Sequence, residues 1–222
     1  MQGSYIQIQI QDTLFIKDPT SSAIGKSILE NGLILLGELG LEEFNFKKLA
    51  LRISSTESTI YRYFENKHQF LAYLFNFYWA WMDLNISFAI TNIDSPKERL
   101  RRIIYVLTQR VYNDVRTPYI DEEILHEVIA VESSKTFLSK NVDQENKSGY
   151  FIQYKKLVDR IADLIIELNP DYKYPNALVS TILESSFHQR FFGLHLPRLT
   201  NEMHIQERLE DFLMDLCLKT IS

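Results

Sequence analysis

Hydrophobic residues recur every three to four positions along most of this chain, which is the spacing that predicts amphipathic helices. The apolar stripe of one such segment, residues 23–39, consists of Ile24, Ile28, Leu35 and Leu39. Residues 20–22, Thr-Ser-Ser, precede the segment as candidate N-caps, and Gly40 follows it as a candidate C-cap. The pattern therefore predicts a first helix from about residue 23 to residue 39.

Two short helices follow this segment. Asn45 is a candidate N-cap for the first of them, whose buried face would consist of Phe46, Leu49, Ala50 and Ile53. Residues 54–56 interrupt the pattern, and a further short helix turns Ile60 and Phe64 inward while Ser58 and Arg62 point away. Two short helices bury little apolar surface by themselves, so the helix at 23–39 is needed to cover them. This is the three-helix arrangement of helix-turn-helix DNA-binding heads.

The rest of the chain also reads as helical. Asn66 can cap a long helix from 67 to about 90, rich in aromatic residues and apolar nearly all round, and further helices are predicted at 96–115, 121–138, 150–168, 176–194 and 201–218. Residues 139–148 are polar and predict a loop. We expect an all-α fold with an arm or small hairpin at 1–19, where hydrophobicity alternates with period two, a helix-turn-helix head at 20–66 and a helical body at 67–222.

Composition supports the all-α prediction. Only 7 glycines and 6 prolines occur among 222 residues, fewer turn residues than a sheet-rich chain would use. The single cysteine, Cys217, has no disulfide partner within the chain, and neither a secretory signal nor an apolar run of membrane-spanning length is evident. A soluble, cytoplasmic protein without membrane association is therefore expected.

Charge is distributed unevenly. The formal net charge is −5, which argues against nucleic-acid binding along the whole chain. Residues 44–67, however, carry five basic residues against two acidic ones. Any contact with DNA must therefore be local, and this short stretch is the place for it.

Catalytic and metal-binding patterns are missing from the sequence. It has no nucleophile elbow, glycine-rich phosphate loop, His-Glu-x-x-His motif or paired-cysteine motif. The residues His126, His188, His195 and His204 do not have the spacing of metal ligands. We therefore expect neither an enzyme nor a metal or cofactor site.

One stretch of the head resembles a known signature. Phe46-Lys47-Lys48-Leu49-Ala50, then Thr59-Ile60-Tyr61-Arg62-Tyr63-Phe64-Glu65-Asn66-Lys67 and Phe70-Leu71, resembles the TetR/AcrR family of transcriptional regulators. The resemblance covers roughly residues 23–75. It implies a homodimeric regulator that binds double-stranded DNA at a near-palindromic operator, most commonly a repressor that a small-molecule effector releases.

The resemblance also assigns site residues. A recognition helix places the side chains of its N-terminal part against base edges in the major groove, and residues at the start of the preceding helix hold phosphates. Lys67 would meet a phosphate as well, because a cation in the first turn of a helix opposes the helix dipole unless an anion is near. The expected DNA contacts are Asn45, Lys47, Glu57, Ser58, Thr59, Tyr61, Arg62, Tyr63 and Lys67.

The turn of the head departs from the family pattern. Ser54 and Ser55 stand where the family has glycine and an apolar residue, so we expect strain from a serine at a position where the family's glycine permits a positive φ angle. Glu57 has two interpretations, a contact to cytosine or a capping box with Ser54, whereas the family register makes Thr56 the N-cap. Tyr61 can likewise contact DNA or simply pack on the first helix.

The body would bind the effector and a second copy of the chain. A largely apolar effector pocket is expected from Trp79, Trp81, Phe88, Tyr105, Tyr112, Phe151, Tyr154 and His188, although each can also be ordinary core. Dimerisation through the last two predicted helices is expected to use Phe187, Phe191, Phe192, Phe212 and Leu216, unless these pack on the core of their own subunit.

An alternative function remains open at this point. The acidic balance of the chain and Glu57 in the recognition helix also suit an interaction protein that has the shape of the family but no longer binds DNA.

Overall fold

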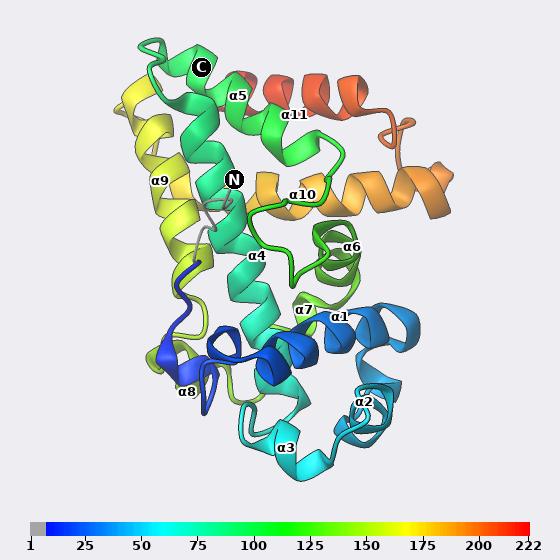
Figure 1. Ribbon diagram of the computed structural model, residues 1–222. Coiled ribbons are helices and arrows are strands. Elements are labelled where there is room, and N and C mark those ends of the chain that lie inside the picture. The colour runs from blue at the N-terminus through cyan, green and yellow to red at the C-terminus, as the bar shows by residue number, and fades with distance from the viewer. Residues whose placement is uncertain (1–7) are drawn as a thin grey trace. The chain divides into compact units, whose positions relative to one another are not determined.

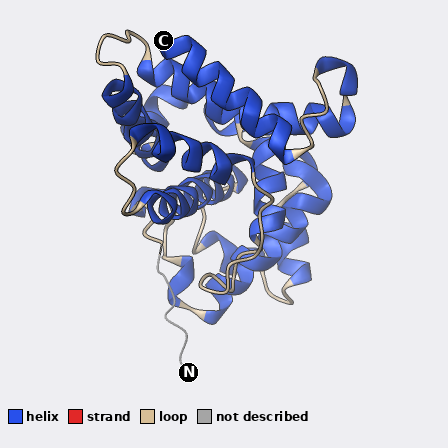
Figure 2. Cartoon of the chain, turned by 90° about the horizontal axis from the view of Figure 1, so that it is seen from above, coloured by secondary structure: helices blue, strands red, loops and turns tan. Residues whose placement is uncertain are grey.

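All regular secondary structure in residues 8–222, which a computed structural model describes, is helical (Figures 1 and 2). None of these helices combines the length and the apolarity needed to cross a membrane. The α-helices are α1 Ala23–Glu43, α2 Phe46–Arg52, α3 Glu57–Tyr61, α4 Lys67–Ile90, α5 Pro96–Thr108, α6 Glu122–Glu132, α7 Ser134–Phe137, α8 Val142–Lys147, α9 Ile152–Leu168, α10 Pro175–His195 and α11 Gln206–Ile221. Short 3-10 turns lie at Asp12–Leu14, Pro19–Ser21 and Pro197–Leu199. The all-α prediction is confirmed.

The helices form two compact units. The first comprises the described part of Met1–Ala80 together with Val111–Gln153, and the second comprises Trp81–Arg110 and Tyr154–Ser222. The first unit contains α1 to α3, the N-terminal part of α4 and α6 to α8. In the second unit, α11 packs against α5 and α10, and its buried face consists of Leu209, Leu213, Cys217 and Ile221.

Three predicted boundaries in the middle of the chain are wrong. Helix α5 ends at Thr108 rather than 115, because the residues after it turn around the buried carboxylate of Glu122, which accepts hydrogen bonds from the Asp114 N–H and the Thr117 hydroxyl. The segment predicted as one helix at 121–138 breaks at Ser133 into α6 and α7. The polar stretch 139–148, predicted as a loop, contains the short helix α8.

The period-two pattern near the N-terminus falls mostly on residues 1–7, which lie outside the described residues. Residues 8–22, called the arm below, contain two 3-10 turns and no strand. The arm is anchored on the first unit: Leu14 is fully buried, the Ile16 N–H donates to the Tyr63 carbonyl at 2.8 Å, and the Thr13 hydroxyl donates to the Ser148 carbonyl.

Local capping defines the three-helix head. The Asn45 side chain accepts from the Lys48 N–H at 2.9 Å and starts α2, and Thr56 accepts from the Thr59 N–H and starts α3. Thr56 is therefore the N-cap, and the alternative capping box of Ser54 with Glu57 is not formed. Gly40 interrupts α1 with φ 69° and ψ 166°, and Ser54 adopts φ 51° in the turn between α2 and α3.

The core of the head is a cluster of aromatic rings. Phe70 of α4 stacks on Phe44 with ring centroids 5.5 Å apart, and it meets Phe64, which follows α3, edge to face at 5.1 Å. Phe64 also contacts Tyr73 one turn along α4. Gly32 of α1 brings the backbone so close to Phe70 that a Cβ atom there would lie 2.6 Å from the ring. Helices α1, α3 and α4 are therefore fixed to one another through Phe70.

Two charged side chains bind the backbone at the end of α1. The Lys67 ammonium donates to the carbonyls of Leu41, Glu42 and Phe44 at 2.7, 3.0 and 3.3 Å. The buried Glu132 carboxylate of α6 accepts from the Leu41 N–H at 3.1 Å. A cation in the first turn of a helix is stabilised by a negative partner. For Lys67 this partner lies within the protein, because the three carbonyl oxygens accept its hydrogen bonds.

The two positive φ angles of the head, at Gly40 and Ser54, generate opposite predictions. Gly40→Ala should lower the free energy of unfolding by about 1–3 kcal/mol, because its φ and ψ belong to a region that only glycine occupies readily. Ser54→Gly should raise it by about 0.5 kcal/mol, because removal of Cβ relieves the strain of a left-handed serine. Urea denaturation followed by circular dichroism measures both, and equal signs for the two variants would contradict this account.

The Lys67 contacts generate a second prediction. Lys67→Met keeps the side-chain stem but loses three hydrogen bonds to carbonyls, so the free energy of unfolding should fall by about 1–2 kcal/mol. The matched control is Lys47→Met, because Lys47 is exposed and has no partner among the described residues; its effect should stay within about 0.5 kcal/mol. Indistinguishable stabilities of the two variants would refute the capping role of Lys67.

Candidate nucleic-acid interface

Helix α3 presents one face to the core of the head and the other to solvent. Ile60 is fully buried, whereas Glu57, Ser58 and Arg62 are exposed. The hydroxyl groups of Ser58 and Thr59 lie 2.8 and 3.0 Å from that of Thr56, so three hydroxyl groups gather at the N-terminal end of the helix. Thr56 was not among the sequence-predicted contacts, although its place as N-cap exposes its side chain beside them.

Tyr61 lies at the junction of α2 and α3. Its ring packs edge to face on Phe46 with centroids 5.2 Å apart, and 48% of its surface remains exposed. The ring therefore packs on α2 and not on α1, and a contact of its exposed part with DNA stays a prediction. Asn45 and Lys47, at the start of α2, are exposed as well.

The five basic residues of this region are not equally available. Lys48 donates to the backbone and carboxylate of Glu43, and Arg52 forms an ion pair with Glu38 at 2.7 Å. Lys67 is held by the carbonyls at the end of α1. Within residues 8–222, Lys47 and Arg62 have neither an ion pair nor a side-chain hydrogen bond. The positive charge offered to an external partner is therefore concentrated in these two side chains.

Tyr63 does not belong to the exposed surface. Only 2% of its surface is accessible, its hydroxyl lies 2.8 Å from that of Ser22, and the Lys17 ammonium lies 5.3 Å from its ring centroid. The sequence prediction included Tyr63 among the expected DNA contacts. The structure instead uses it to join the end of α3 to the start of α1, so it cannot reach a base edge in this conformation.

The predicted effector-pocket residues are divided between the two units. Trp79, Tyr112 and Phe151 belong to the first unit and the other five to the second. Phe88, Tyr105 and Tyr112 expose more than 40% of their surfaces, which is not expected of the lining of an enclosed apolar cavity. The Tyr154 hydroxyl donates to the Glu184 carboxylate at 3.0 Å, which together with burial raises the pKa of Tyr154.

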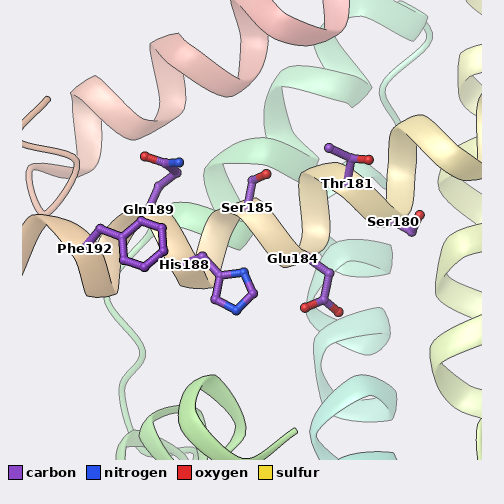
Figure 3. Close-up of a pocket in the computed structure, with 7 residues that line it drawn as sticks. All are labelled: Ser180, Thr181, Glu184, Ser185, His188, Gln189 and Phe192. Atoms are coloured by element: carbon purple, nitrogen blue, oxygen red, sulfur yellow. The ribbon is translucent and has the colours of Figure 1, made fainter. Parts of the chain in front are cut away.

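Helix α10 carries a shallow groove on the side away from its buried face. The groove has a volume of about 420 Å³ and is lined by Ser180, Thr181, Glu184, Ser185, His188, Gln189 and Phe192. Figure 3 shows Glu184 and His188 projecting from one edge of the helix, and Thr181, Ser185 and Gln189 from the other. His188 is thus the one predicted pocket residue that lines this groove, and the groove is open to solvent, with polar residues and Phe192 in its lining.

The predicted dimer residues divide into two groups. Phe187 is buried in its own unit, as the alternative interpretation expected, whereas Phe191 and Phe212 are each 37% exposed and Phe192 and Leu216 are partly exposed. Other apolar side chains in the last turn of α10 and before α11 are also exposed, although the sequence prediction did not assign them to the dimer interface: Leu194, Leu196, Leu199 and Ile205. Among residues 8–222, no three His, Cys, Asp or Glu side chains are grouped in a way that could hold a metal ion.

Comparison with known proteins gives structural likeness alone. No family model and no curated protein sequence matches this chain. A protein of known structure from Shewanella sp. PV-4, described as a TetR-family transcription regulator, is 17% identical with a TM-score of 0.60 over 86% of this chain and 95% of that one. The fatty acid degradation regulator FadR from Bacillus halodurans is 14% identical, with a TM-score of 0.59 over 85% and 93% of the two chains.

A third similar structure is AibR in complex with isovaleryl coenzyme A and operator DNA, 18% identical with a TM-score of 0.56 over 86% of this chain and 96% of that one. These likenesses extend over nearly the whole of each protein, head and body together. The chain therefore has the fold of the TetR-family transcription regulators.

Proposed function

We propose that this protein is a DNA-binding transcription regulator and that α3 is its recognition helix. The observation that carries the proposal is the exposed face of α3: a helix anchored by Ile60 and capped by Thr56 presents Ser58, Tyr61 and an unpaired Arg62 to solvent. Such a helix, braced by two others, fits the major groove of B-DNA. The fold, which it shares with AibR bound to operator DNA, supports the same conclusion.

The proposed contacts follow from exposure and charge. Arg62 would donate to guanine, Ser58 and Glu57 would meet base edges near the start of α3, and Tyr61 and Thr59 would contact the adjacent backbone or bases. Asn45 and Lys47, at the start of α2, would hold a phosphate. Tyr63 and Lys67 are assigned to holding the head together, because both have partners within the protein.

A homodimer is the second part of the proposal. The exposed apolar residues at the end of α10, in the 196–205 connection and on α11 form a face that water would otherwise cover. Pairing of this face with its copy across a two-fold axis would place two recognition helices about 34–36 Å apart, matching successive major grooves. The operator would then be nearly palindromic.

Regulation by an effector is the third part. We infer a repressor that a small, largely apolar molecule releases, and helix α4 is suited to the coupling because one continuous helix contributes to both units. The contact of Glu132 in α6 with the Leu41 N–H offers a second connection to the head. An effector acts only if it binds the released state more tightly than the DNA-bound state.

The alternative, an interaction protein without DNA binding, is favoured by one observation. Three of the five basic residues in 44–67 are engaged within the protein, and the whole chain carries a charge of −5. Two free cations per subunit are few for phosphate contacts, although a dimer doubles them. DNA binding must therefore be measured directly.

Binding to DNA upstream of the protein's own gene tests the proposed interface. Arg62→Ala should weaken binding to the preferred sequence by about 1–3 kcal/mol and relax the base preference at one position. Lys47→Ala should weaken binding to all sequences equally and lower the dependence of log K on log salt by about one unit. Fluorescence anisotropy at several salt concentrations measures both effects.

The control for this experiment is Lys173→Ala, which removes an exposed cation from the second unit. Sequence-specific binding that survives Arg62→Ala and Lys47→Ala unchanged would refute the assigned contacts. No sequence-specific binding by the unaltered protein, even at low salt, would favour the alternative function.

The dimer has its own test. Phe212→Glu and Leu194→Glu each place a charge in the proposed apolar face and should shift the protein from dimer to monomer at micromolar concentration, because burial of an unpaired charge costs several kcal/mol. Val115→Glu, at a side chain that is 88% exposed in the first unit, is the control and should leave the dimer intact. Sedimentation equilibrium distinguishes the two states, and monomers of the unaltered chain would contradict the proposal.

A further inference from the structure

A cavity lies beneath the arm, apart from the surfaces discussed so far. It has a volume of about 350 Å³, space for roughly ten water-sized groups at about 30 Å³ each. All of its lining belongs to the first unit and comes from the arm and one residue of α4: Ile8, Gln9, Ile10, Asp12, Phe15, Asp18, Thr20 and Tyr73.

Tyr73 is the buried wall of this cavity. Only 1% of its surface is accessible, and its hydroxyl has no hydrogen-bond partner among the described residues. Burial, with contributions from Tyr119 and Asp18, raises the pKa of Tyr73 well above its usual value, so the hydroxyl stays protonated at neutral pH. Because this hydroxyl has no partner within residues 8–222, it is available to a molecule in the cavity.

The cavity is also negatively charged. One oxygen of Asp18, Oδ1, accepts from both the N–H and the hydroxyl of Thr20 at 2.8 Å, while Oδ2 has no partner within residues 8–222. Neither Asp12 nor Asp18 forms an ion pair with any described residue. Two lysines of the arm and of the start of α1 lie over aromatic rings instead, Lys17 over Tyr63 and Lys26 over Tyr119.

The other lining residues can pack against the carbon chain of an organic cation. Phe15 packs edge to face on Tyr73 with ring centroids 6.2 Å apart, and Ile8 and Ile10 add aliphatic surface. An ammonium group is attracted both to carboxylates and to the face of an aromatic ring. The phenol oxygen of Tyr73 can accept from an ammonium while its proton is donated to a carboxylate.

We propose that this cavity is a binding site for a small organic cation, an aliphatic amine or diamine whose ammonium group binds Asp18 and Tyr73 and whose carbon chain packs on Phe15. The arm beside the site is bonded to the end of the recognition helix, through the Ile16 N–H and the Tyr63 carbonyl. An amine bound here would hold the arm against α3. The site itself does not depend on the proposed DNA binding.

Calorimetric titration of the full-length chain without DNA tests the site. The probes are putrescine and n-butylamine, with neutral 1,4-butanediol as the matched control. At least one cation should bind, and the diol should not. Asp18→Asn should weaken binding at least about tenfold, since Asn keeps the Oδ1 acceptor for Thr20 but removes the charge. Tyr73→Phe should weaken it about three- to tenfold.

Asp163→Asn removes an exposed carboxylate in the second unit and is the control variant, expected to bind like the unaltered chain. Asp12→Asn gives a second test of the charge should Asp18→Asn fold poorly in a thermal melt. Equal binding of the diol and the diamine, or no binding of either cation at millimolar concentration, would overturn the proposal. So would binding of Mg²⁺ in place of the amines, or affinities for the amines that neither cavity variant changes.

Discussion

The packing of Phe70 is the contact on which the head depends. Its ring lies between Phe44 and Phe64, and Gly32 allows α1 to approach it. Because Phe64 lies three residues after the end of α3 and Phe70 is in the first turns of α4, this contact fixes α3 to α4, the longest helix in residues 8–222. A displacement of α4 would therefore move α3 with it, which is the mechanical requirement for regulation from the body.

Polar contacts also hold the helices of the head together, at the ends of α1 and α3. Lys67 and Glu132 satisfy backbone groups where Gly40 interrupts α1, and Tyr63 joins the end of α3 to Ser22 at the start of α1. Each contact connects residues distant in sequence, so each restrains the angle between two helices. The arm adds a further restraint through Ile16 and Thr13, on the side of the head away from the turn at Ser54.

Short-range chemistry made much of this fold predictable. The caps at Asn45 and Thr56, the break at Gly40 and the buried faces around Ile60 follow from spacing and from the properties of single residues. The partners of Lys67 and Tyr63 do not, because they lie 23 to 41 residues away and depend on how three helices meet. For the same reason, exposed aromatic residues such as Phe88 and Tyr112 were indistinguishable from pocket residues in the sequence.

In the proposed function, two copies of α3 contact base edges in DNA. Selection of bound duplexes from a random-sequence pool by the full-length protein tests it most directly, since no operator need be known. We expect enrichment of a near-palindromic sequence. The centres of its half-sites should be about 10 base pairs apart, which is one helical turn, or a multiple of this distance. A pool without any enriched sequence after repeated rounds at low salt would contradict it.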